Sequence, residues 1–269
     1  MLTLQSRRPD PRLDPFIRLY VQRETRRGDR EIVEPVVARL GTMLEFQFAR
    51  PYEIPVYGTS QILISPPIAV IGPITYRRVR LVIRDEVQAL AILFQPQGFR
   101  ALFGIPTSLV TDLGVDASAV LGGEVTELYE RLGNAATFSQ RVNLLNDFLR
   151  QCLLASNPLD KIHHALDRLI IPGARIRIAD IARQAGVTVR QLERRSLEYT
   201  GVSPKTLLRI ARFQQVLKMK SKGSLNWVEV AHALEYYDQM HMIRDFRAMA
   251  GDSPVRAIDH IQPEHLINF

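Results

Sequence analysis

The sequence of 269 residues contains a single cysteine, Cys152, and no long apolar run. One thiol excludes an internal disulfide and fits a reducing compartment. No stretch approaches the roughly 20 apolar residues that a membrane span needs, and residues 1–30 lack the apolar core of a signal peptide. We therefore expect a cytoplasmic protein that does not act at a membrane.

Motifs of common catalytic and metal sites are also missing. The sequence has no glycine-rich phosphate loop, G-x-S-x-G elbow or metalloprotease motif. All six histidines follow the region of strand-like patterning, which excludes a barrel with a histidine-ligated metal there. His163 and His164 are adjacent in a predicted helix, so they point to different faces and do not easily share a metal. We predict that the protein is not an enzyme and holds no metal or other cofactor.

The first part of the chain has the patterning of β-strands. Residues 31–96 alternate apolar and polar side chains, as in the segment from Leu44 to Phe48, and prolines mark the turns. This pattern predicts a compact antiparallel sheet or small barrel, with its best hairpin around Asp85-Glu86. Residues 1–28 are rich in proline and arginine, and they contain one short apolar element around residues 16–21.

Helical periodicity begins after Gly98. It predicts amphipathic helices over residues 115–132 and 137–154, and the apolar stripe of the second helix, which includes Cys152, is more typical of a core face than of a dimer interface. The break at residues 155–158 marks the domain boundary, and residues 159–171 are expected to open the next domain. The predicted fold class is α+β, with a β-rich regulatory or dimerisation domain over residues 1–155 and an all-α domain over residues 156–269.

The all-α region contains one pattern twice, between Arg175 and Ile258. Each copy has a short apolar-periodic helix, a tight turn and a second helix with an exposed polar face. Ile181 and Val230 occupy equivalent positions 49 residues apart, while the second helices begin 50 residues apart. The two copies therefore differ by one turn residue. A helix from Pro204 to about residue 220 lies between them and is expected to fix their distance.

Polar residues mark where these helices start. Thr188 with Gln191, and Asn226 with Glu229, have the spacing of capping boxes, in which each side chain bonds the other residue's backbone amide. Asp238 is in position to cap the second helix of the second copy. The packing faces are predicted to include Leu192, Ser196 and Tyr199 in the first copy, and Val228, Val230, Ala231, Leu234 and Phe246 in the second.

The opposite helix faces suit the major groove of DNA. Arginine can donate two parallel hydrogen bonds to guanine, and two such helices on a rigid spacer reach successive groove segments about 34 Å apart. Residues 174–258 carry 15 Lys and Arg against 8 Asp and Glu, whereas the remainder is balanced at 20 against 20. The whole formal charge of +7 therefore lies where phosphates would be bound.

Two stretches carry a resemblance to a known family. The sequences IADIARQAGVTVRQLERRSLEYTGVSPKTLLRIARFQQVL and WVEVAHALEYYDQMHMIRDFRAMAGDSPVRAI resemble the DNA-binding domain of AraC/XylS-type bacterial transcription regulators, over about a third of the chain. The resemblance implies two helix-turn-helix units joined by a linker helix, and it places base reading on Arg190, Glu193, Arg194, Gln239, Met240, Ile243 and Arg244. It places backbone contacts and helix caps on Thr188, Gln191, Arg195, Lys205, Arg209, Asn226, Asp238 and His241.

Four positions depart from the family pattern. Ser196 replaces a common aromatic residue and Met242 a common Phe, which is expected to loosen packing slightly. Glu235 replaces the usual turn glycine, so it needs either a positive φ at some cost or a different turn. Met240 replaces a usual serine and removes a hydroxyl group beside the DNA. These changes bear on the base specificity of the second unit more than on its fold.

The resemblance implies promoter DNA as the partner, and it leaves RNA polymerase, a small-molecule effector and a second copy of the chain open. Two alternatives remain: a DNA-targeted enzyme that transfers an alkyl group to Cys152, and a DNA-binding module without an effector. In the first domain, five residues are candidates for a ligand pocket, although a core role for the Phe residues is favoured: Phe46, Phe48, Tyr57, Tyr76 and Arg80.

Overall fold

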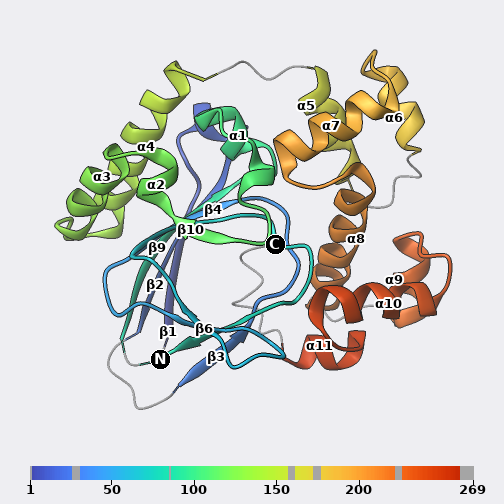
Figure 1. Ribbon diagram of the computed structural model, residues 1–269, viewed down its shortest axis with the longest axis horizontal. Helices are drawn as coiled ribbons and strands as arrows, with labels where there is room; N and C mark the ends of the chain where they lie inside the picture. The colour runs from blue at the N-terminus through green and yellow to red at the C-terminus, as the bar shows by residue number, and fades with distance from the viewer. Residues whose placement is uncertain are drawn as a thin grey trace.

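The computed structural model describes residues 2–25, 31–84, 86–156, 161–171, 177–221 and 226–260. β-Sheet structure fills the N-terminal part, and the C-terminal helices lie along one side of it (Figure 1). The predicted α+β class is therefore confirmed. Within these ranges, no helix has both the length and the apolar character that crossing a bilayer requires.

The strands form two antiparallel sheets. The larger sheet has six strands in the order β1-β2-β9-β4-β7-β10, and the smaller has four in the order β3-β8-β5-β6. Their bounds are β1 (Leu2–Arg7), β2 (Ile17–Thr25), β3 (Ile32–Pro35), β4 (Met43–Gln47), β5 (Glu53–Pro55), β6 (Ile62–Ile64), β7 (Ile68–Ile71), β8 (Arg80–Ile83), β9 (Val87–Phe94) and β10 (Gly114–Asp116).

The larger sheet carries a different environment on each face. On strand β4, Leu44 and Phe46 are fully buried in an apolar core that includes residues from the neighbouring helices. The alternate residues Glu45 and Gln47 line a cavity facing the smaller sheet, and both are only 3% exposed. The helices on the first face are α1 (Gly98–Phe103), α2 (Ala117–Leu121), α3 (Glu124–Gly133) and α4 (Phe138–Leu154).

The predicted hairpin around Asp85-Glu86 is wrong. Strands β8 and β9 flank this position, but β8 pairs with β3 and β5, whereas β9 pairs with β2 and β4. Strand β9 has the sequence VQALAILF and is buried at all but one of its positions. A central place in the larger sheet, covered on both faces, buries this apolar strand better than a two-stranded hairpin does. Asp85 itself lies outside the described residues.

Two further predictions need correction. The N-terminal segment is mostly sheet, because β1 pairs with β2 and β2 with β9, so the expected apolar element is the start of a nine-residue strand. The helix expected over residues 115–132 is interrupted, since Val115 lies in β10, and Gly122, at φ 82°, ends α2 before α3 begins. Glycine adopts such a left-handed φ without the steric cost of a side chain. Helix α4, in contrast, matches the helix predicted over residues 137–154, and it starts with a capping box at Thr137.

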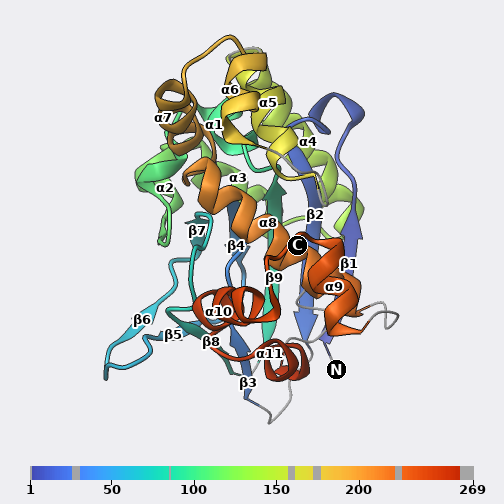
Figure 2. The same cartoon turned by 90° about the vertical axis from the view of Figure 1, so that its right-hand side faces the viewer.

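The C-terminal helices share one apolar core. They are α5 (Lys161–Leu169), α6 (Ile178–Gln184), α7 (Val189–Thr200), α8 (Pro204–Ser221), α9 (Trp227–Ala233), α10 (Gln239–Ala250) and α11 (Pro254–His260). Helix α8 runs between the pair α6–α7 and the pair α9–α10 (Figure 2). Val37, Ala38 and Leu40, from the loop before β4, belong to this same core. Packing therefore joins the two predicted domains.

Candidate nucleic-acid interface

The C-terminal region contains two units of equal size. Helices α6 and α9 each have 7 residues, and α7 and α10 each have 12. The first helices start 49 residues apart and the second helices 50 apart, as the sequence repeat predicts. We call α7 and α10 the reading helices, because their exposed faces carry the predicted base-reading residues.

The predicted capping boxes start one helix in each unit, α7 in the first and α9 in the second. Thr188 Oγ1 accepts a hydrogen bond from the Gln191 amide at 3.2 Å, and Gln191 Oε1 accepts one from the Thr188 amide at 2.8 Å. Asn226 and Glu229 form the same reciprocal pair at 2.9 and 3.0 Å. These bonds satisfy amides that a helix start leaves without intrahelical partners, so both capping boxes are confirmed.

The turns of the two units share one conformation. Gly186 in the first unit has φ 71°, and Glu235, 49 residues later, has φ 56°. Glu235 therefore takes the positive φ that the sequence left as one of two possibilities. Because its Cβ crowds the backbone there, the second turn is strained relative to the first.

The reading helices present the predicted faces to solvent. In α7, Arg190, Glu193 and Arg194 are exposed, whereas in α10 Ile243 is half-buried beside exposed Gln239, Met240 and Arg244. Within the described residues, the three arginines Arg190, Arg194 and Arg244 form no ion pair. Their guanidinium groups are therefore available to a ligand. That they read bases remains a prediction.

Several residues predicted to hold the DNA backbone have partners inside the protein. Arg195 pairs with Glu198 at 3.1 Å, and Arg209 Nη2 pairs with Asp245 Oδ1 at 2.7 Å, whereas Lys205 is exposed on α8. Asp238 caps α10 by accepting from the His241 amide at 2.6 Å. Asp245, which sequence reasoning missed, is buried and joins α10 to α8. An acidic residue on the inward face of α10 is the signal that could have revealed it.

The structure shows the surroundings of three residues whose packing was predicted. Ser196 is fully buried, and its hydroxyl donates to the Val202 carbonyl at 2.7 Å, so this position contributes a hydrogen bond where an aromatic side chain was expected. Met242 is buried in the shared core. Val228, predicted on a packing face, is instead 63% exposed, because the core side of the short helix α9 is filled by Val230 and Ala231.

The two reading helices end against the N-terminal region at equivalent atoms. The Tyr199 carbonyl accepts from Thr107 Oγ1 at 2.9 Å, and the Met249 carbonyl, 50 residues later, accepts from the Ala38 amide at 2.9 Å. Thr107 belongs to the short 3-10 helix η2 (Thr107–Leu109). Because the last carbonyls of a helix lack intrahelical donors, these bonds satisfy otherwise unpaired groups at both helix ends.

The glycines that follow lie in close contact with the same region. Thr111 Oγ1 donates to the Gly201 carbonyl at 3.0 Å, and a Cβ added to Gly201 would lie 2.3 Å from that hydroxyl. Beside Gly251, Arg77 donates to the Ala250 carbonyl at 3.1 Å. Gly201 and Gly251 both have φ 77°, which favours glycine. The N-terminal region therefore contacts both reading helices at their C-terminal ends.

Charged and polar side chains add to the contact at the first unit. Arg100 on α1 pairs with Glu198 on α7 at 2.7 Å. Burial alone would raise the pKa of Glu198, but the hydrogen bond and charge of Arg100, together with Arg195, hold it below its usual value. Gln97 donates to Asp167 Oδ1 at 2.7 Å, and burial still raises the pKa of that carboxyl group.

The space between the two sheets is a cavity of about 270 Å³. Strands from both sheets line it, and its polar lining includes Arg23, Arg39 and Glu45. None of the five residues predicted to line a pocket contributes. Phe46 lies in the core on the other face of the larger sheet, as the favoured interpretation held, and Tyr57 and Arg80 border a separate hollow beside Arg77.

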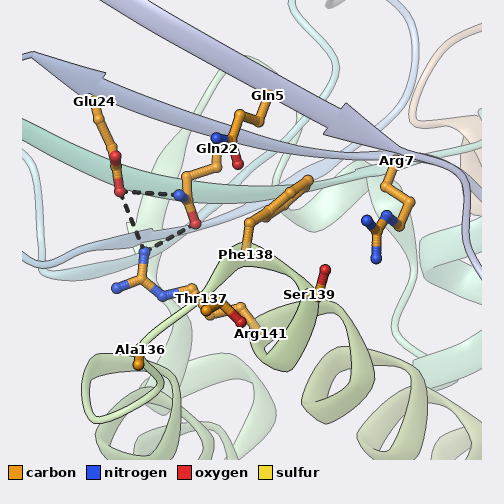
Figure 3. Close-up of a pocket in the computed structure, with 9 residues that line it drawn as sticks. All are labelled: Gln5, Arg7, Gln22, Glu24, Ala136, Thr137, Phe138, Ser139 and Arg141. Atoms are coloured by element: carbon orange, nitrogen blue, oxygen red, sulfur yellow. Dashed lines mark hydrogen bonds and ion pairs between the residues drawn. The ribbon is translucent and has the colours of Figure 1, made fainter.

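A second hollow, of about 390 Å³, lies between the β1–β2 pair and the start of α4 (Figure 3). Its polar groups largely bond one another: Gln22 Nε2 donates to Glu24 at 2.9 Å, and Arg141 donates to Gln22 at 2.8 Å. Arg7 at its edge is exposed and lies over the Phe138 ring. The hollow is thus a solvated surface feature.

Cys152 does not have the environment of a nucleophile. Burial and the nearby charge of Glu124 raise the pKa of its thiol to about 11. A reactive cysteine needs the opposite shift, since the thiolate is the species that attacks. This shift does not favour the alternative in which Cys152 accepts an alkyl group.

Comparisons with known proteins agree with this arrangement. A family described as helix-turn-helix domain matches residues 181–258, and one described as Domain of unknown function (DUF6597) matches residues 5–116. No curated protein sequence matches the chain. An apo variant of ToxT from Vibrio cholerae strain SCE256 has a TM-score of 0.50 at 9% identity, covering 97% of this chain and 98% of that chain. This likeness is one of fold.

Two other solved structures are more distant. Wild-type ToxT from the same strain, bound to an unsaturated fatty acid, has a TM-score of 0.47 at 10% identity, covering 96% of this chain and 94% of that chain. The AraC-like transcriptional activator CuxR has a TM-score of 0.29 at 13% identity, covering 82% of this chain and 88% of that chain.

Proposed function

We propose that this chain, whose residues 181–258 match a helix-turn-helix domain family, is an AraC/XylS-type DNA-binding transcription regulator and that both of its units read bases in one DNA site. Each unit would place its reading helix in the major groove. The observation that carries the proposal is the pair of equally long helices with exposed faces, on which Arg190, Arg194 and Arg244 have no ion-pair partner among the described residues. Arginine in this setting suits guanine.

The charge distribution supports the same conclusion. The surplus of Lys and Arg between residues 174 and 258 supplies the whole net charge of +7. Contacts with phosphate release counterions, so affinity for the site is expected to fall steeply as salt rises. One chain presents both reading helices, so binding to two groove segments does not require a dimer or RNA polymerase.

We also propose that a small molecule controls DNA binding through the N-terminal domain. The cavity between the two sheets supports this proposal, because it is large enough for a ligand and its walls carry buried charged groups. The contacts of the N-terminal region with both reading helices give such a ligand a route to the DNA-binding surface.

Selection of bound duplexes from a random DNA pool tests the DNA-reading proposal. Wild type is expected to enrich two short sequence blocks about 10 base pairs apart, one for each reading helix. Arg194→Ala should degrade one block and Arg244→Ala the other, each with a loss of about 1–3 kcal/mol for the affected block.

The matched control is Arg183→Ala. This arginine lies on α6, its side chain is 77% exposed, and it is outside the reading faces. It should leave both blocks intact. Enrichment of no sequence by the wild type, in the absence and presence of candidate effectors, would contradict base reading. A single block that only Arg194→Ala degrades would restrict reading to the first unit.

A further inference from the structure

The cavity between the two sheets holds charged groups that are mostly satisfied internally. Arg23 Nη2 pairs with Glu45 at 2.8 Å, and Arg23 Nη1 lies 3.4 Å from Glu34. Ser65 Oγ donates to Gln47 Oε1 at 2.8 Å. On β4, Glu45 and Gln47 alternate with Leu44 and Phe46 of the core, so the strand places these two polar side chains between the sheets.

Arg39 is the buried exception in this wall, whereas Arg78, which also lacks an ion pair among the described residues, is exposed. Arg39 is 8% exposed, and among the described residues its guanidinium donates one hydrogen bond, to the Gly41 carbonyl at 2.9 Å. In the described part of the chain it has no ion pair with a carboxylate. Burial and the nearby charge of Arg18 lower the pKa of Arg39 to about 10, although the charge of Glu45 acts in the opposite direction, and Arg39 is still charged at neutral pH. A buried cation without a carboxylate in contact with it is costly, and an anion in the cavity would reduce that cost.

The rest of the cavity wall suits an apolar body. Ile54, Ile71, Ile74 and Leu81 contribute to it from both sheets and the intervening loop. Its volume of about 270 Å³ admits a molecule of about ten non-hydrogen atoms, because a cavity of about 150 Å³ holds benzene. A short aliphatic or aromatic acid has this size and combines an apolar body with one anionic group.

We propose that this cavity binds a small organic anion, whose carboxylate pairs with Arg39 and whose apolar part fills the space between the sheets. This inference rests on the proposed function, since it identifies the class of effector that controls DNA binding. The residues that flank the cavity wall show how occupancy reaches the reading helices.

Two segments of the wall continue directly into the contacts with those helices. Arg39 follows Ala38, whose amide donates to the Met249 carbonyl at the end of α10. On the other side, Asp112 and Gly114 line the cavity, and Thr111 donates to the Gly201 carbonyl after α7. A ligand that moves Arg39 or Asp112 therefore acts one residue away from each contact.

The segments are also bonded to each other. The amides of Arg39 and Ile74 each donate to the other residue's carbonyl, at 2.8 and 2.9 Å. The neighbouring Thr75 donates to Asp112 through its amide at 2.6 Å and its hydroxyl at 2.7 Å. This chain of bonds couples the two walls, so one ligand would shift both contacts together.

Calorimetric titration of the full chain tests the ligand class. The probes are 3-phenylpropionate, its uncharged amide and 3-phenylpropylamine, which have similar size and differ in charge. The carboxylate is expected to bind, and the amide should bind at least about tenfold more weakly because it lacks the charge that pairs with Arg39. Benzoate and octanoate extend the panel to other shapes.

Variants locate the site. Arg39→Met should abolish the preference for the carboxylate over the amide, whereas Arg39→Lys should retain part of it. Arg7→Met is the matched control, because Arg7 borders the second hollow and is exposed. Circular dichroism shows whether each variant is folded. Equal binding of carboxylate and amide by the wild type would overturn the proposal without reference to any variant.

The remaining outcomes of the titrations also test the proposal. Binding of the amine in preference to the carboxylate would assign the cavity to cations through Glu34 and Glu45. Failure of all three carboxylates to bind at millimolar concentration would refute the organic-anion site. If they fail while the wild type still selects a DNA sequence, only this inference is lost. If they bind without changing the affinity for the selected DNA by at least about threefold, coupling is refuted.

Discussion

The two helix-turn-helix units have matching backbones but different attachments. At the end of α7 the equivalent carbonyl is held by a side chain, Thr107, and at the end of α10 by a backbone amide, that of Ala38. The first unit also has the Arg100–Glu198 pair with α1. The second unit is tied to the linker helix instead, through Arg209 and buried Asp245. Duplication has thus preserved the helix geometry while each copy is anchored by its own contacts.

The largest effect that this comparison predicts is at the close contact after α7. Gly201→Ala should lower the free energy of unfolding by about 3 kcal/mol, because the new Cβ meets both a positive φ and the Thr111 hydroxyl at 2.3 Å. Urea unfolding measures the loss. Gly186→Ala is the control, since Gly186 has φ 71° and open space around it. It should cost only about 1 kcal/mol, and equal losses would show that the contact contributes nothing.

The anchor of the second unit is expected to matter next. Asp245→Asn should destabilise the protein by about 2 kcal/mol, because it removes the charge that Arg209 pairs with at a buried site. The partial exposure of Arg209 keeps the loss below that of a fully buried pair. Position 195 is the equivalent of position 245 in the first unit, and Arg195→Gln should cost less than about 0.5 kcal/mol. If both variants unfold at the same urea concentration, the anchoring is symmetric.

The smallest effect concerns the turns. Glu235→Gly should stabilise the protein by about 1 kcal/mol, because glycine accepts φ 56° without the strain of a Cβ. Glu235→Ala removes the same side chain but keeps the Cβ, so it should bring no gain. Thermal unfolding of the two variants side by side compares them. A gain in both, or in neither, would mean that the second turn is no more strained than the first.

The sequence was most informative where function depends on local geometry. The caps at Thr188 and Asn226, the offsets between the helices and the exposed faces of α7 and α10 follow from spacing along one helix. Base reading itself could not be settled in this way, because it depends on a partner. Asp245 was missed for a related reason: its place on the inward face of α10 indicates a buried carboxylate, but not which residue of another helix pairs with it.

The sequence predicted the order of strands in the sheets less well. Alternation correctly separated Leu44 and Phe46 from Glu45 and Gln47, but it could not say which strand lies beside which. It also could not show that the polar face would be covered. Covering depends on the second sheet, whose strands come from distant parts of the chain, so the cavity and Arg39 emerge only in three dimensions.

The placement of Val37, Ala38 and Leu40 in the C-terminal core has a consequence for how the protein is made. The ribosome completes these residues well before it reaches the helices that they pack against. They must then remain available until the last helices emerge, so the C-terminal core closes on a surface that is already present. A polypeptide that begins near residue 156 would lack that surface and leave an apolar gap between α8, α10 and solvent.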